Sequence, residues 1–84
     1  MKIHGYVQGV FFRESARAEA LRLGIFGFAR NEPDGGVYIE AEGNDENLKK
    51  FIDWCRHGPE MAKVTKVDVE YSDELKFYND FKIM

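Results

Sequence analysis

The chain has 84 residues, which is enough for one hydrophobic core, so we expect residues 1–84 to form a single domain. Hydrophobic residues make up 44% of the sequence, and this content favours a folded protein over a disordered one. Twelve basic and fifteen acidic residues give a net charge of −3, which disfavours duplex DNA as a partner, because such binding depends on Lys and Arg neutralising phosphates.

The first half of the chain predicts a strand, a helix and a hairpin. Residues 1–7 alternate between apolar and polar positions, which is typical of a half-buried strand, and residues 8–11 form a turn. Gly24 is predicted to end the helix that follows this turn. Residues 25–31 and 37–42 are predicted to be two strands joined by a turn that contains Pro and Gly. The helix has one apolar stripe, at Phe12, Ala16, Ala20 and Leu23.

The second half of the chain predicts one more helix and two strands. Asn44 is the expected N-cap of an amphipathic helix that ends at Gly58 and Pro59. Residues 64–71 form a long strand and residues 77–83 a last short strand at a sheet edge. The order βαββαβ with a terminal strand predicts a ferredoxin-like α+β sandwich. Its sheet would be antiparallel, with four to five strands and both helices on one face.

The segment from Gly5 to Arg13 has two features that are unfavourable at the start of a helix. The first turn of a helix has four N–H groups without helical partners, and no good capping residue lies between Gln8 and Phe12. Arg13 also places a positive charge in this turn, where the helix dipole opposes it. A bound anion would accept hydrogen bonds from the free N–H groups and neutralise Arg13, and Gly9 would let the backbone approach the anion closely. The alternative is an ordinary turn, with hydrated N–H groups and Arg13 in solvent.

Asn31 ends the second predicted strand, directly before the turn. Its side chain can face the anion site only if the third strand lies between the first and the second in the sheet. The alternative is an Asn that begins the turn and bonds to its own backbone, which is a common arrangement. Taken alone, the position of Asn31 favours this alternative.

Three blocks of the sequence resemble the acylphosphatase family in their order and spacing. They are Gly5-Tyr6-Val7-Gln8-Gly9-Val10-Phe11-Phe12-Arg13, Leu23-Gly24-Ile25-Phe26-Gly27-Phe28-Ala29-Arg30-Asn31 and Asp34-Gly35-Gly36-Val37. The resemblance implies hydrolysis of a small acyl phosphate to a carboxylate and inorganic phosphate, with no metal ion or other cofactor. It implies that Asn31 positions the attacking water. It also implies a phosphate site made by the guanidinium of Arg13 and the main-chain N–H groups of Gln8, Gly9, Val10, Phe11 and Phe12.

The other reactive side chains are explained by structural roles. Cys55 lies on the apolar stripe of the second helix and is expected in the core. It is the single cysteine, so an internal disulfide is excluded, which fits a reducing compartment. His4 is expected on the outer sheet face without an acidic partner, and His57 in the last turn of the second helix. No apolar run approaches the ~20 residues of a membrane span and no signal peptide is visible, so we expect a cytoplasmic monomer.

Two alternative functions share this fold. One is a binder of single-stranded nucleic acid, in which bases stack on aromatic side chains of the outer sheet face. The expected aromatic side chains are Tyr6, Phe26, Phe28 and Tyr38. Four acidic side chains on the same face would repel the nucleic-acid backbone and disfavour this function: Glu40, Glu42, Asp68 and Glu70. The other alternative is an acylphosphatase-like module of the hydrogenase-maturation type, which would have the same fold and pocket.

Overall fold

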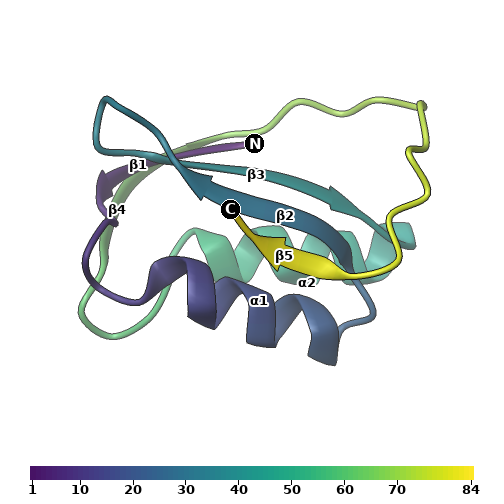
Figure 1. The fold of residues 1–84 in the computed structure, drawn as a ribbon, viewed down its shortest axis with the longest axis horizontal. Helices are drawn as coiled ribbons and strands as arrows, with labels where there is room; N and C mark the ends of the chain where they lie inside the picture. The colour runs from purple at the N-terminus through teal and green to yellow at the C-terminus, as the bar shows by residue number, and fades with distance from the viewer.

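A computed structural model describes all residues 1–84, with two helices against one face of a five-stranded sheet (Figure 1). The strand order across the sheet is β4-β1-β3-β2-β5. This arrangement confirms the expected ferredoxin-like α+β fold with both helices on one side. The elements are β1 (Lys2–Tyr6), α1 (Phe12–Arg22), β2 (Phe26–Asn31), β3 (Val37–Glu42), α2 (Asp45–Cys55), β4 (Lys63–Asp68) and β5 (Phe81–Ile83).

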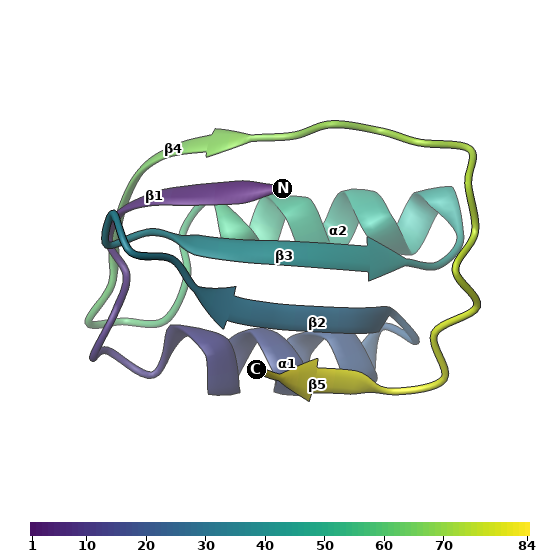
Figure 2. The same cartoon turned by 45° about the horizontal axis from the view of Figure 1, so that its top comes forward.

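The sheet is mixed, so the expectation of a purely antiparallel sheet was wrong. Strands β4, β1, β3 and β2 pair antiparallel, but β5 runs parallel to β2, with Gly27 opposite Phe81. The physical reason is the route of residues 69–80, which cross from the β4 edge to the β5 edge around one end of the sheet (Figure 2). A strand that starts at the end where β4 stops must run opposite to β4, and therefore in the direction of β2.

The last two strands are shorter than the sequence pattern predicts, and part of the chain between them is bonded to a side chain. Strand β4 ends at Asp68 and β5 begins at Phe81. Between them, the main-chain N–H groups of Lys76 and Tyr78 donate to the carboxylate of Glu42. These N–H groups therefore have acceptors without a neighbouring strand. We call residues 69–80 the crossover segment.

The core lies between the helices and the sheet and includes the apolar stripes expected for both helices. The ring of Phe81 in β5 is fully buried and lies edge-on against Phe51 of α2, with 5.8 Å between ring centroids. Small side chains at Ala16 and Ala20 let α1 approach the sheet closely. The core cluster consists of Ile3, Val7, Val10, Phe12, Ala16, Ala20, Leu23, Ile25, Ala29, Val37, Ile39, Phe51, Cys55 and Phe81.

A carboxylate on the outer sheet face holds the crossover segment in place. Glu40 accepts hydrogen bonds of 2.8 Å from the hydroxyls of Tyr38 and Tyr78 and from Nζ of Lys76. These donors favour the charged carboxylate, and the Lys76 bond is the largest contribution, so the pKa of Glu40 falls from 4.5 to about 2. The ionised form of Glu40 therefore stabilises the fold.

We predict that Glu40→Gln reduces the pH dependence of stability in acid. The folded pKa of Glu40 lies below its ordinary value, so its contribution is complete above pH 4.5 and is lost as the pH falls toward about 2. At neutral pH the variant should lose about 1 kcal/mol of unfolding free energy, the scale of partly exposed charged hydrogen bonds. Urea denaturation at a series of pH values measures both effects.

Glu60→Gln is the matched control, because Glu60 is exposed. If Glu40→Gln and Glu60→Gln change the acid limb of the stability curve equally, the role assigned to Glu40 is wrong.

Candidate functional site

The loop between β1 and α1 is anchored in the core at alternate positions. Val10 and Phe12 are almost fully buried, while Phe11 between them is exposed. Gly9 and Phe11 have positive φ angles of 74° and 63°, whereas Val10 does not. When successive residues alternate between left-handed and right-handed backbone conformations, their N–H groups point toward one side and form a concave surface that can bind an anion. Glycine takes such a conformation without a steric penalty, so Gly9 suits its place in the loop.

Helix α1 begins without a cap, as the sequence predicted. Its N-cap residue, Phe11, makes no side-chain hydrogen bond to the helix. The first main-chain N–H of the helix with a partner is that of Ser15, which donates to the carbonyl of Phe11 at 3.0 Å. Helix α2 differs, because Oδ1 of Asn44 accepts from the N–H of Asn47 at 2.8 Å, which confirms the predicted cap. The start of α1 therefore has free main-chain donors at Phe12, Arg13 and Glu14 and no side-chain cap.

Arg13 lies in the first turn of α1 and reaches toward the end of β5. Its Nη1 donates to the main-chain oxygen of Met84 at 3.0 Å, and this is its one hydrogen bond to the protein. One turn later, Nε of Arg17 donates to the carbonyl of Phe81, also at 3.0 Å. Two arginines of α1 thus donate hydrogen bonds to the main chain of this segment, one to Phe81 in β5 and one to Met84 directly after it. Most of the donors of the Arg13 guanidinium stay free for a ligand.

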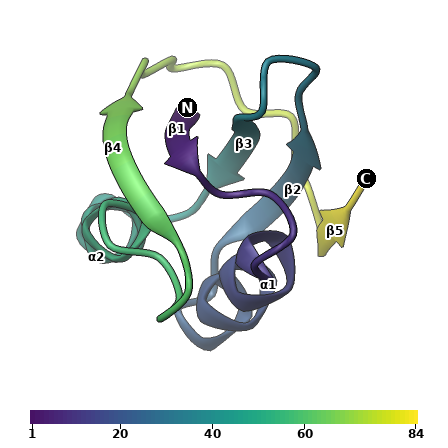
Figure 3. The same cartoon turned by 90° about the vertical axis from the view of Figure 1, so that its left-hand side faces the viewer.

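Asn31 shares a cavity with Arg13. Strand β3 lies between β1 and β2, as this placement requires, and Asn31 is opposite Val37 at the end of the hairpin. The local bond that begins the turn is made by Asp34, whose Oδ1 accepts from the N–H of Gly36 at 3.0 Å. An open cavity of about 190 Å³ is lined by Val7, Gly9, Phe11, Phe12, Arg13, Glu14 and Asn31. The structure therefore brings Arg13, Asn31 and the loop to one place. Figure 3 shows the end of the sheet from which this loop leads from β1 to α1.

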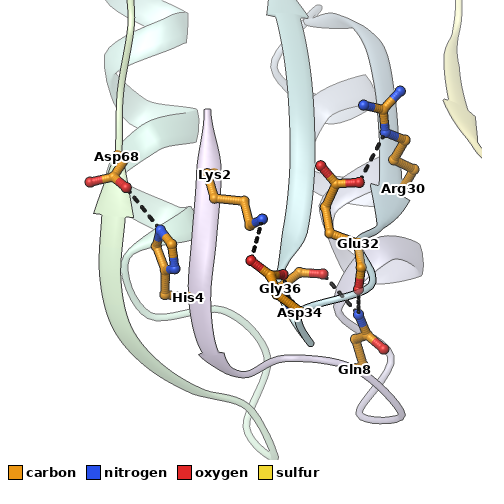
Figure 4. A network of polar contacts seen from close by, with 8 residues as sticks. All are labelled: Lys2, His4, Gln8, Arg30, Glu32, Asp34, Gly36 and Asp68. Carbon is orange, nitrogen blue, oxygen red and sulfur yellow. Dashed lines mark hydrogen bonds and ion pairs between the residues drawn. The ribbon is translucent and has the colours of Figure 1, made fainter.

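The side chain of Gln8 connects the loop to the turn that follows Asn31. Nε2 of Gln8 donates to the carbonyls of Glu32 and Gly36 at 2.8 and 2.9 Å (Figure 4). These two residues close the turn, since the N–H of Glu32 donates to the carbonyl of Gly36 at 2.9 Å. The sequence analysis considered only the main-chain N–H of Gln8. Its side-chain contact spans 24 and 28 residues and has no local signal in the sequence.

Glu14 also lines the cavity, and the sequence analysis did not consider it. It is an exposed acidic residue in the first turn of α1, where negative charge favours the helix dipole. Its carboxylate introduces charge of the same sign as a phosphate into the cavity rim. Arg13 and the free N–H groups must therefore outweigh this repulsion if a phosphate binds.

Comparisons with known proteins lead to one family. The Acylphosphatase family model matches residues 1–83. Over 73 residues the chain is 45% identical to an acylphosphatase of Thiobacillus denitrificans, which covers 87% of this chain and 82% of that protein. The chain belongs to the acylphosphatase family.

Solved structures of acylphosphatases share this fold along almost the whole chain. The crystal structure of acylphosphatase from Bacillus subtilis superimposes with a TM-score of 0.96 at 35% identity, covering 99% of this chain and 92% of that one. Full-length HypF in its phosphate- and nucleotide-bound form matches with a TM-score of 0.86 at 31% identity, covering 99% of this chain but only 11% of that one. The acylphosphatase fold therefore also occurs within a much longer chain.

The remaining reactive side chains have structural partners. His4 was expected to lack an acidic partner, and this was wrong, because its Nε2 lies 2.8 Å from Oδ2 of Asp68 on the neighbouring strand β4. Cys55 is fully buried, as expected, and burial raises the pKa of its thiol. Nδ1 of His57 contacts the carbonyl of Asp53 at 3.1 Å. No group of three or more His, Cys, Asp or Glu is placed to hold a metal ion, and neither helix is long and apolar enough to cross a membrane.

Proposed function

We propose that the protein hydrolyses small acyl phosphates to a carboxylate and inorganic phosphate without a metal ion. In this proposal residues 8–12 form a phosphate-binding loop, in which the N–H groups of Gln8, Gly9, Val10, Phe11 and Phe12 act together with Arg13. The observation that carries the proposal is the cavity that joins the uncapped start of α1, the free donors of Arg13 and the side chain of Asn31. Membership of the acylphosphatase family supports the reaction class.

The charges of the site suit the transfer of a phosphoryl group to water. The transition state is loose, and negative charge spreads over the non-bridging phosphate oxygens. Preorganised N–H groups and the guanidinium of Arg13 stabilise that charge more strongly than bulk water does. The leaving group is a carboxylate, which is stable as an anion, so the reaction needs no strong general acid. These groups can replace the electrophilic role that a metal ion has in other phosphoryl-transfer enzymes.

The attacking water needs to be oriented, and the proposal assigns this role to Asn31. Its side-chain amide both donates and accepts hydrogen bonds, but it does not take up a proton near neutral pH. The proton of the water therefore moves to an oxygen of the substrate phosphate. Because the proposed mechanism uses no side chain as an acid or a base, it implies a hydrolysis rate that changes little near neutral pH.

The proposal also includes the oligomeric state of the enzyme, its cellular compartment and the absence of a nucleic-acid partner. The proposal includes a monomer, because a single chain is enough to bring Arg13 and Asn31 to one cavity. The free, buried Cys55 is compatible with the reducing cytoplasm. For nucleic acid, the aromatic rings of the outer face are poorly placed, because Phe28 packs on Tyr38 and Tyr78 with centroids 5.9 and 6.1 Å apart. The hydroxyls of both tyrosines bind Glu40.

The likeness to HypF favours a second candidate, a module that holds phosphate within a larger assembly. The two candidates differ in turnover by the chain alone. Release of inorganic phosphate from acetyl phosphate, with a chelator present, supports the enzyme, whereas phosphate binding without turnover supports the module.

We predict that Arg13→Ala lowers kcat/KM for acetyl phosphate by about 10²–10³-fold, the effect of removing one donor to a developing anion. Arg13→Lys should restore only part of this loss, because an ammonium group lacks the planar fork of the guanidinium. Colorimetric detection of inorganic phosphate measures the rate, and circular dichroism checks the fold. Arg22→Ala is the control, since Arg22 lies in the last turn of α1 and pairs with Glu19. Equal losses in Arg13→Ala and Arg22→Ala would contradict the role of Arg13.

We predict that Asn31→Ala lowers kcat by about 10²-fold while the inhibition constant of inorganic phosphate changes much less, because water loses its orientation and the phosphate keeps its ligands. Steady-state kinetics with phosphate as a competitive inhibitor separates the two effects. Asn79→Ala is the control, since Asn79 is exposed in the crossover segment. The role of Asn31 is wrong if its variant loses phosphate affinity and keeps its kcat.

A further inference from the structure

Phe11 has a backbone conformation that a large side chain rarely adopts. Its φ and ψ angles of 63° and 26° lie in the left-handed region, where the Cβ atom of an L-residue crowds the backbone. The anion-binding shape of the loop requires this conformation, but it does not require a phenyl ring. A glycine would satisfy the same geometry without strain. The presence of Phe at position 11 therefore calls for a separate reason.

Packing within the chain does not supply that reason. The side chain of Phe11 is 64% exposed, although its neighbours Val10 and Phe12 are buried. The ring of Phe12 packs against that of Trp54 in a tilted arrangement, with centroids 5.5 Å apart, but the ring of Phe11 has no aromatic partner. A strained residue with an exposed apolar ring gains little for the folded state. Strain of this kind at a binding site suggests a role with a ligand.

The position of the ring shows which part of a substrate it can meet. Phe11 lines the same cavity as Arg13 and Asn31. The phosphoryl group would occupy the N–H groups and the guanidinium, so the acyl group, joined to it through one bridging oxygen, must extend along the wall of this open cavity. No second aromatic side chain except the buried Phe12 lines it. Phe11 is thus the exposed aromatic surface beside the leaving group.

We propose that Phe11 is a specificity-determining residue of the site, whose ring packs against the acyl group and contributes to the discrimination between a large apolar acyl group and the methyl group of acetyl phosphate. The proposal rests on the proposed function and deepens it by naming the residue that contacts the acyl group. Aromatic rings pack well against planar apolar groups, and the contact removes the surface of both from water. The carboxylate that leaves carries the acyl group away, so the ring contributes to binding and does not take part in the transfer step.

The test compares two substrates in the same variants. The measured quantity is kcat/KM for benzoyl phosphate divided by kcat/KM for acetyl phosphate, so any loss common to both substrates through altered loop geometry cancels. We expect this ratio to fall about tenfold in Phe11→Ala, the scale of discrimination by apolar contacts. The change should reside in KM for benzoyl phosphate. Phe11→Tyr keeps the ring and should keep the ratio.

Tyr6→Ala provides a matched control. Tyr6 is 62% exposed, which is close to the exposure of Phe11, but it does not line the cavity. Its loss should leave the ratio unchanged. The proposal is overturned if the ratio in Phe11→Ala equals that of the unmodified protein, if it rises, or if Tyr6→Ala lowers it to the same extent.

A second measurement separates this proposal from the proposed function. The probes are (2-oxo-2-phenylethyl)phosphonate and (2-oxopropyl)phosphonate, which carry a methylene in place of the bridging oxygen and cannot be hydrolysed in the same way. Isothermal titration gives the affinity ratio of the two. If the unmodified protein hydrolyses neither acyl phosphate, the proposed function fails, while a stronger affinity for the phenyl probe that disappears in Phe11→Ala still supports the role of the ring. Equal affinities for the two probes would contradict it.

Discussion

The free N–H groups at the start of α1 are the feature on which the rest of the site depends. They are free because Val10 and Phe12 anchor the loop in the core and Phe11, at the N-cap position, makes no capping bond. A helix end in this state has a concentrated positive potential. Adding Arg13 to it lowers stability unless an anion is bound nearby. In the proposed function, a phosphate bound at this helix end would offset the positive charge of Arg13 and accept hydrogen bonds from the free N–H groups.

The fold brings the other components to this helix end. Strand β3 lies between β1 and β2, and this order places the end of the hairpin beside the loop. The side chain of Gln8 then connects the loop directly to the turn that follows Asn31 through two hydrogen bonds. At the opposite end of the sheet, Glu40 and Glu42 hold the crossover segment that delivers β5 (Figure 2). Met84, which directly follows β5, in turn provides the main-chain oxygen that accepts from Arg13.

Local features were predictable from the sequence, and long-range contacts were not. The stripe of α1, the Asn44 cap and the missing cap of α1 depend on neighbours within a few residues, and all three are present in the structure. The parallel direction of β5 depends on the path of the crossover segment. Part of this segment has the sequence pattern of a strand, but its N–H groups at Lys76 and Tyr78 donate to the carboxylate of Glu42 and not to a neighbouring strand. The pairing of His4 with Asp68 joins residues 64 positions apart, so no local pattern could indicate it. The position of Arg13 in the first turn of α1 was predictable because its signal is local, whereas the placement of Asn31 in the same cavity depends on the strand order.

The most direct test of the account is a crystal structure of the protein with inorganic phosphate. The account predicts a phosphate in the cavity, with its oxygens about 2.7–3.1 Å from main-chain nitrogens of the loop and from the guanidinium of Arg13. A structure in which the phosphate binds elsewhere, or in which the carboxylate of Glu14 occupies these N–H groups and leaves the cavity closed to the anion, would contradict it.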